Sequence, residues 1–268
     1  MPTKPEIRIG TSAFTAAGWE NFFYPEGMKP AEYLSHYATQ FDFVEVDSTF
    51  YRTPAISTVK GWHAKTPKNF LFALKVPQVI THEKVCVDCD DDLKHFLTAA
   101  DNLGDKLGAL VFQFGYFNNA AFKTQADFIA VLEPFLKSLP KGYPFALEIR
   151  NKSWMDDRFM DLLRKHKVAF AVIDQGWVPR PWEFKTRLNH VTADFAYIRL
   201  LGDRKGIEQI TKVWDKVVVD KQAELKNWAG EVESIQKLKI PVMVAVNNHF
   251  AGCAPETVRA FQKMLKLI

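Results

Sequence analysis

The sequence has few cysteines and no long apolar run. Its three cysteines, Cys86, Cys89 and Cys253, are too sparse for a disulfide framework and fit a reducing compartment. No apolar run approaches the ~20 residues that a membrane-spanning helix needs, and the amino-terminal segment MPTKPEIRIG has no apolar signal core. We therefore expect a cytoplasmic protein that does not span a membrane.

The sequence also lacks a strong excess of one charge. Lysine and arginine number 35 against 31 aspartates and glutamates, which gives a net charge of +4. This mildly basic balance tolerates an anionic ligand, but it is far from the composition typical of nucleic-acid-binding proteins. No polybasic tract is present. Composition therefore favours a small anionic ligand over a nucleic-acid partner.

Several motifs that identify common enzyme classes are missing. The sequence has no P-loop, no dinucleotide-binding fingerprint and no nucleophile elbow. Its one C-x-x-C, formed by Cys86 and Cys89, has no second pair with which to hold zinc. We interpret these two residues as free thiols in a loop.

Eight strand-like segments alternate with amphipathic helical segments from end to end. A glycine-rich phosphate loop after the first strand, usual in doubly wound sheets, is absent because Gly10 is followed by Thr-Ser-Ala. Eight strands in ~250 residues therefore predict a single (β/α)8 TIM barrel over residues 1–268. The expected strands are Ile7–Thr11, Phe43–Ser48, Phe70–Val76, Leu107–Phe114, Pro144–Arg150, Val168–Asp174, Phe195–Leu201 and Val242–Val246.

Two segments stand apart from this alternation. Gly176–Val191 resembles a loop. Lys205–Val219 has apolar residues at helical spacing, which fits a lid, an interface or a further packed helix.

Polar residues cluster at the carboxyl ends of the predicted strands, where TIM barrels carry their active sites. Glu45 with Asp47, and Glu148 with Arg150, are two residues apart and should share one face of a strand. All eight strand ends contribute polar residues. A rim of solvent-exposed side chains would explain any one of them but explains the whole set poorly. The candidates are Thr11, Ser12, Asp47, Lys75, Gln113, Glu148, Arg150, Asp174, Arg199, Asn247, Asn248 and His249.

The stretch FVEVDSTFYRTP, from Phe43 to Pro54, is the most informative of these ends. Glu45 and Asp47 are expected in the barrel lumen as counter-charges to Lys75, Arg150 or Arg199. The hydroxyl and aromatic residues that follow are then the better candidates for contact with a substrate: Ser48, Thr49 and Tyr51.

These residues favour an anion site. Arginine forks suit carboxylate or phosphate groups. We therefore predict an enzyme acting on a small phosphorylated or acidic substrate, which Arg150 and Arg199 hold while Glu148 or Asp47 acts as general acid or base. Lys75 is a third catalytic candidate, as a Schiff-base lysine.

Other chemistries remain open at this stage. A nucleic-acid-binding or repair-type phosphodiester protein, a glycosidase-like enzyme using Asp47 and Glu148, and a non-catalytic binding barrel are the alternatives. Asp47, Glu148 and Asp174 have the oxygens that Mg²⁺ prefers. Because three cationic side chains accompany them, we expect ion pairing, with no bound metal and no cofactor.

Several segments are similar to one known family. IGTSAF, VEVDSTFYRTP, FALKVPQVITH, LGALVFQF, LEIRNKSW and NNHFAGCAP resemble the YecE-like family. The resemblance implies a TIM barrel but no established reaction, and it adds Thr81, His82 and Trp154 to the candidate residues. Family members commonly carry Asn at position 47 and His at positions 151 and 201, where this chain has Asp47, Asn151 and Leu201. A mechanism that needs those histidines does not fit this chain.

Overall fold

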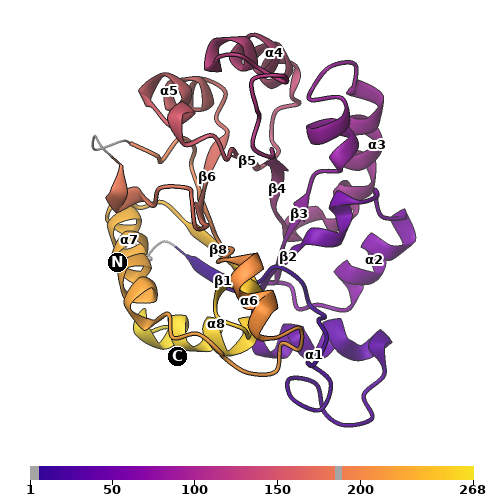
Figure 1. The fold of residues 1–268 in the computed structure, drawn as a ribbon. Helices are drawn as coiled ribbons and strands as arrows, with labels where there is room; N and C mark the ends of the chain where they lie inside the picture. Colours follow the sequence, from indigo (N-terminus) through magenta and orange to yellow (C-terminus); the bar gives the residue numbers. More distant parts are fainter. Residues whose placement is uncertain (1–5, 185–188) are drawn as a thin grey trace.

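The computed structural model describes residues 6–184 and 189–268. Eight parallel strands close into a barrel in which each strand pairs with the next and β8 pairs with β1 (Figure 1). The predicted TIM barrel is confirmed. The strands are β1 (Ile7–Thr11), β2 (Phe43–Val46), β3 (Leu71–Lys75), β4 (Leu107–Gln113), β5 (Phe145–Glu148), β6 (Ala169–Asp174), β7 (Ala196–Leu200) and β8 (Val242–Val246).

Helices surround the barrel (Figure 1). Their apolar faces pack on the outward-facing residues of the strands in one continuous core. The α-helices are α1 (Tyr33–Gln40), α2 (Ile56–Ala64), α3 (Asp90–Ala100), α4 (Gln125–Ser138), α5 (Asp157–Lys165), α6 (Arg204–Ile210), α7 (Gln222–Lys237) and α8 (Ala254–Met264). Among the described residues, no helix combines the length and apolar character needed to cross a membrane.

A second, smaller core fills the barrel itself. Because both faces of each strand are buried, large residues face the helices and mostly small ones face inward. On β2, for example, Val44 and Val46 belong to the outer core and Phe43 to the inner one. The inner core includes Ala73, Ala109, Val111, Ala146, Ala169, Ala171, Tyr197, Met243 and Ala245.

Strands β1 and β2 meet at one point only, where Thr11 pairs with Val44. A Cβ at Gly10 would lie 1.8 Å from the carbonyl oxygen of Phe43, so this close approach requires glycine. The Tyr37 hydroxyl of α1 bridges the two strands, because it donates to the Phe43 carbonyl and accepts from the Thr11 amide, each at 2.9 Å. Beyond the ends of the two strands, the Asp47 amide donates to the Ser12 carbonyl oxygen at 3.4 Å.

Two strands end two residues earlier than predicted. β2 ends at Val46 and a 3-10 turn, Asp47–Phe50, follows, while β5 ends at Glu148 and Arg150 lies beyond it. The Thr49 hydroxyl holds the turn by bonding to the carbonyl oxygens of Val46 and Lys75, at 2.8 and 2.6 Å. Strand periodicity therefore does not decide where Asp47 and Arg150 point.

The two segments that stand apart from the strand–helix alternation form mostly irregular structure where they are described. In Lys205–Val219, helix α6 covers only the first residues and the rest is irregular. The expected loop Gly176–Val191 contains a 3-10 turn at Pro181–Glu183, and its residues 185–188 lie outside the described part of the chain, as do residues 1–5.

Candidate active site

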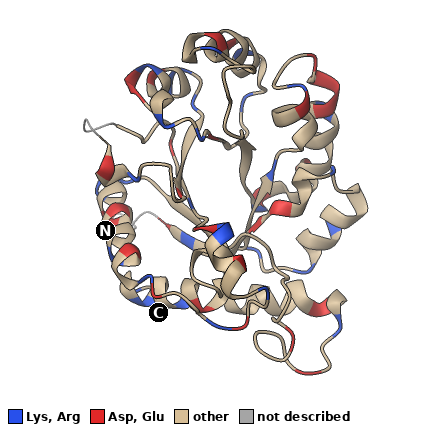
Figure 2. Cartoon of the chain, in the orientation of Figure 1, with Lys and Arg blue, Asp and Glu red and all other residues tan. Residues whose placement is uncertain are grey.

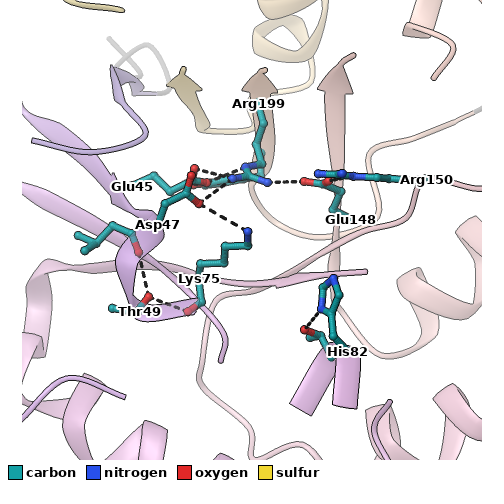
Figure 3. Close-up of polar contacts among 11 residues, drawn as sticks. Glu45, Asp47, Thr49, Lys75, His82, Glu148, Arg150 and Arg199 are labelled. Carbon is teal, nitrogen blue, oxygen red and sulfur yellow. Dashed lines mark hydrogen bonds and ion pairs between the residues drawn. The ribbon is translucent and has the colours of Figure 1, made fainter. Parts of the chain in front are cut away.

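Arg199, on β7, is the centre of a group of charged side chains inside the barrel (Figure 3). It is only 1% exposed. Its Nε and Nη2 donate to the two carboxylate oxygens of Glu45, both at 2.8 Å, while Nη1 donates to Glu148 at 2.5 Å and Nη2 to Asp47 at 3.0 Å. Four of its five N–H groups are therefore directed at three carboxylates.

Two further cations complete this group. Arg150 donates from Nε to the other oxygen of Glu148 at 3.0 Å, and the Lys75 ammonium lies 3.9 Å from Asp47. Three carboxylates and three cations thus cancel in formal charge, as a buried network requires. We call these six residues the ionic cluster: Glu45, Asp47, Lys75, Glu148, Arg150 and Arg199.

The cations of the ionic cluster are not equivalent. Arg199 has few donors left for a ligand. Arg150 is 23% exposed, and its two Nη groups form no hydrogen bond with any described residue. Lys75 is 12% exposed and its Nζ likewise forms none within the described part of the chain. Arg150 and Lys75 are therefore the cations with unused donors.

Lys75 lies in a largely desolvated environment. Its ammonium sits 3.9 Å from the centroid of the Phe50 ring, in a cation–π contact. Burial lowers the pKa of Lys75 below its usual value, an effect that the Asp47 carboxylate opposes and the Arg199 charge reinforces. This amine therefore gives up its proton more readily than an ordinary lysine.

The pKa values of the two glutamates beside Arg199 are shifted in opposite directions. Burial opposes ionisation of Glu148, but Arg199 and Arg150 outweigh it and lower the pKa of this carboxyl group. For Glu45 burial prevails over the Arg199 charge and raises the pKa. Glu148 is thus a stable anion whose two oxygens are both occupied.

His82 stands beside the ionic cluster (Figure 3). It lies in a single π-helical turn, Val79–Glu83, where its Nδ1 is 2.8 Å from the hydroxyl of the buried Thr81. Burial, and then the charges of Lys75 and Arg150, lower the pKa of His82. The imidazole is therefore neutral at physiological pH.

Asp174 does not join the other acids, which corrects the expected grouping with Asp47 and Glu148. It lies on the outer face of β6, where it accepts from Trp228 of α7 at 2.6 Å and from both Nε and Nη2 of Arg180. Trp154 is also turned away from the barrel, since it is buried against Phe117 and Phe128.

Asn247, Asn248 and His249 follow β8 and stabilise local structure. The Asn247 side-chain oxygen accepts from the His249 amide at 3.0 Å, and that of Asn248 accepts from the first amide of α8 at 2.8 Å. His249 reaches Glu208 of α6 at 3.1 Å, which ties α6 to this end of the barrel. Among the described residues, no hydrogen bond or ion pair joins these three side chains to the ionic cluster.

The remaining candidates occupy three places. Gln113 lies opposite Glu148 in the pairing of β4 and β5, on the inner face. Ser12 borders a cavity of about 100 Å³ that Asp47, Asn247 and Asn248 also line. A much larger open groove, about 1080 Å³, lies over α2 and α3; it is lined by Ser48, Thr49 and Tyr51 but by no residue of the ionic cluster.

Tyr197 also belongs to the group of side chains around Arg199, but it was not among the residues predicted from the sequence. The Tyr197 hydroxyl donates to Glu45 at 2.8 Å. Spacing in the sequence could have indicated Tyr197, because it lies two residues before Arg199 and residues two apart on a strand share one face. Glu45 lies two residues before Asp47 in the same way.

The described residues contain no group of three or more histidines, cysteines, aspartates or glutamates placed to hold a metal ion. Cys86 and Cys89 are free thiols, as interpreted, but both are buried. Burial raises the pKa of Cys89 to about 11. Neither thiol is therefore activated as a nucleophile.

The chain matches known proteins over nearly its whole length. Residues 8–267 match the model of a protein family of unknown function, DUF72. The UPF0759 protein YunF of Bacillus subtilis is 25% identical over 93% of each chain. The UPF0759 protein YecE of Escherichia coli K12 is 31% identical over 118 residues, and this match spans 41% of that relative.

Solved structures agree with this assignment. A DUF72 family protein from Thermotoga maritima has a TM-score of 0.78 and 27% identity, over 97% of this chain and 99% of that chain. One from Enterococcus faecalis has a TM-score of 0.70 at 22% identity, over 98% and 99%. The resemblance to the YecE-like family is confirmed, and the chain belongs to the DUF72 family.

Proposed function

We propose that the protein is an enzyme that acts on a small anionic substrate at the ionic cluster. In this proposal Arg150 binds the anionic group of the substrate and Lys75 transfers a proton. One observation carries it: Arg199 is committed to three carboxylates, whereas Arg150 and Lys75 keep unused donors and are partly exposed.

Arg150 is suited to the binding role. Glu148 fixes its Nε at 3.0 Å, which orients the guanidinium and leaves the two Nη groups for a carboxylate or phosphate. Gln113 lies opposite Glu148 on the inner face and supplies a neutral amide beside it. We therefore assign the anion-binding role, which was expected for both arginines, to Arg150 alone, and we propose that Arg199 positions the acids.

Lys75 is suited to the proton-transfer role. A general base works best when its pKa lies near the working pH, and burial moves the pKa of Lys75 in that direction. Glu148 is less suited, because both of its oxygens are occupied and its pKa is lowered. Asp47, 3.9 Å from Lys75, is placed to stabilise the protonated amine.

The same geometry weighs against the alternatives. A glycosidase needs a carboxylic acid that is free to protonate the leaving group, whereas Asp47 and Glu148 both bind Arg199. A nucleic-acid site needs an excess of positive charge, and the ionic cluster has none.

A thermal-shift screen with small phosphates and carboxylates tests the proposal. Bound ligand stabilises the folded state by RT ln(1 + [L]/Kd), so at ten times Kd we expect the melting temperature to rise by several degrees, roughly 3–5 °C. Arg150→Ala should abolish this rise. Arg158→Ala, which removes an exposed arginine of α5, is the matched control and should keep it.

Two results would contradict the proposal. One is a screen in which no phosphate or carboxylate stabilises the wild-type protein. The other is a rise that Arg150→Ala and Arg158→Ala both retain, because the anion would then bind elsewhere.

A further inference from the structure

We infer that the small cavity between the ends of β8, β1 and β2 is a subsite for hydroxyl groups of the anionic ligand. The inference rests on the proposed function and makes it more specific. It names the substrate class as small anions that also carry hydroxyl groups.

The cavity has the size of a subsite rather than of a whole ligand site. Its volume is about 100 Å³, roughly the share of three water molecules in the liquid. It is lined mainly by residues at and just beyond the ends of β1, β2 and β8, and it has room for one or two hydroxyl-bearing carbons.

Two of the side chains that line it carry buried polar atoms without a partner. Ser12 is 3% exposed and Trp19 is 1% exposed. The Ser12 hydroxyl and the Trp19 Nε1 form no hydrogen bond with any described residue. Buried polar groups are nearly always paired in folded proteins, because leaving them unpaired costs free energy. These two therefore mark a place where a polar ligand group or water completes the structure.

The other polar lining residues define the chemistry of that group. The side-chain oxygens of Asn247 and Asn248 accept backbone hydrogen bonds, and their amide nitrogens form none within the described part of the chain. Trp19 and both asparagines therefore offer hydrogen-bond donors to the cavity, and Asp47 offers acceptors. The Ser12 hydroxyl can donate or accept. A hydroxyl group, which donates and accepts, matches this set. A second anionic group does not, because it would face the Asp47 charge.

Asp47 joins the cavity to the ionic cluster. It lines the cavity and also binds Arg199 at 3.0 Å, with the Lys75 ammonium 3.9 Å away. A ligand whose anionic group binds Arg150 therefore has a hydroxyl site at the far side of the same cluster. Phosphate esters of polyols and hydroxylated carboxylic acids share this chemistry.

Calorimetric titration with matched ligand pairs tests the inference. The first pair is glycerol 3-phosphate and n-propyl phosphate, and the second is D-glycerate and propionate; each pair differs only in hydroxyl groups. We expect the hydroxylated member of at least one pair to bind about tenfold more tightly, and the pair concerned identifies the anionic group.

Variants separate the subsite from the anion site. Ser12→Ala should remove most of the tenfold preference and leave binding of the deoxy member unchanged. Trp19→Phe, which removes the second unpaired donor, is a second variant should Ser12→Ala fold poorly. Ser35→Ala, on the exposed face of α1, is the matched control and should retain the preference.

The outcomes distinguish this inference from the proposed function. If all four probes fail to bind the wild-type protein, the proposed function fails and the inference falls with it. If the anions bind but both members of each pair bind equally, or if Ser12→Ala and Trp19→Phe keep the preference, only the inference is overturned.

Discussion

At the scale of single residues, Arg199 decides whether the site can exist. Three carboxylates converge inside an apolar barrel, and each would be costly to bury alone. Arginine suits this position because its planar fork reaches all three from one side chain, which the point charge of lysine cannot do. Of the three cations in the ionic cluster, Arg199 is thus the structural one.

This difference predicts that two arginine substitutions destabilise the protein to very different extents. Arg199→Ala should lower the free energy of unfolding by about 3–5 kcal/mol, because it leaves buried carboxylates without a counter-charge. Arg199→Lys should recover little of that loss. Arg150→Ala, at a partly exposed position, should cost about 1 kcal/mol or less. Urea denaturation measures all three, and an Arg199→Ala loss below about 1 kcal/mol would refute the structural role.

At the scale of elements, the connections between helices and strands are set by backbone geometry. Helix α5 ends in a Schellman motif, in which the Val168 amide donates to the Leu163 carbonyl at 3.0 Å and the Lys167 amide to Arg164 at 3.1 Å. Lys167 adopts a φ of 55°, a conformation that favours glycine. The chain therefore enters β6 through a turn that its own sequence does not favour.

The turn makes a testable prediction about Lys167. Lys167→Gly should raise the free energy of unfolding by about 0.5–1 kcal/mol, because glycine adopts this conformation without the strain that a Cβ adds. The same substitution at the exposed Lys94, inside α3, should instead cost about 1 kcal/mol. Equilibrium denaturation compares the two, and a loss of stability at both positions would show that Lys167 is not strained.

At the scale of the whole molecule, charge is arranged in two ways. Lysine, arginine, aspartate and glutamate are interspersed over the outer helices (Figure 2). The ionic cluster is neutral, and Glu45, Glu148 and Arg199 at its centre are buried. The outer charges are screened by solvent and contribute little to stability. The pH dependence of the unfolding free energy should therefore reflect the ionisable groups of the interior more strongly than those of the surface.

Glu148 supplies a prediction with a definite sign. Its pKa is lowered in the folded state from 4.5, so the unfolded chain takes up the proton first as the pH falls. Its contribution is present above pH 4.5 and is lost as the pH falls through the folded-state pKa. The difference in unfolding free energy between the wild type and Glu148→Gln should thus shrink below pH 4.5, by up to about 1.4 kcal/mol per pH unit.

Urea denaturation from pH ~7 to ~3 measures this difference. Glu26→Gln, at an exposed position, is the control and should follow the wild type throughout. A difference that stays constant down to the acid limit would mean that Glu148 is not held as an anion by Arg199 and Arg150.

The sequence by itself determined the barrel and the end at which its polar residues gather. Alternating strands and helices are local patterns, and parallel strands bring their carboxyl ends to one side whatever their partners are. Successive side chains on a strand point to opposite faces, so the sequence also indicated that Val44 and Val46 face the helices while Glu45 faces the lumen.

Only the tertiary structure decided which of those polar residues meet. Arg199 and Glu45 lie 154 positions apart, so nothing local relates them. The outward direction of the Asp174 side chain could not be predicted from the sequence. Strand β6 is apolar on both faces, so no polar–apolar alternation shows which side Asp174 takes. Asp47 and Arg150 lie beyond the ends of their strands, where turns and not periodicity set direction. Which polar side chains meet inside a closed barrel depends on the register of all eight strands, and that register is a property of the assembled fold.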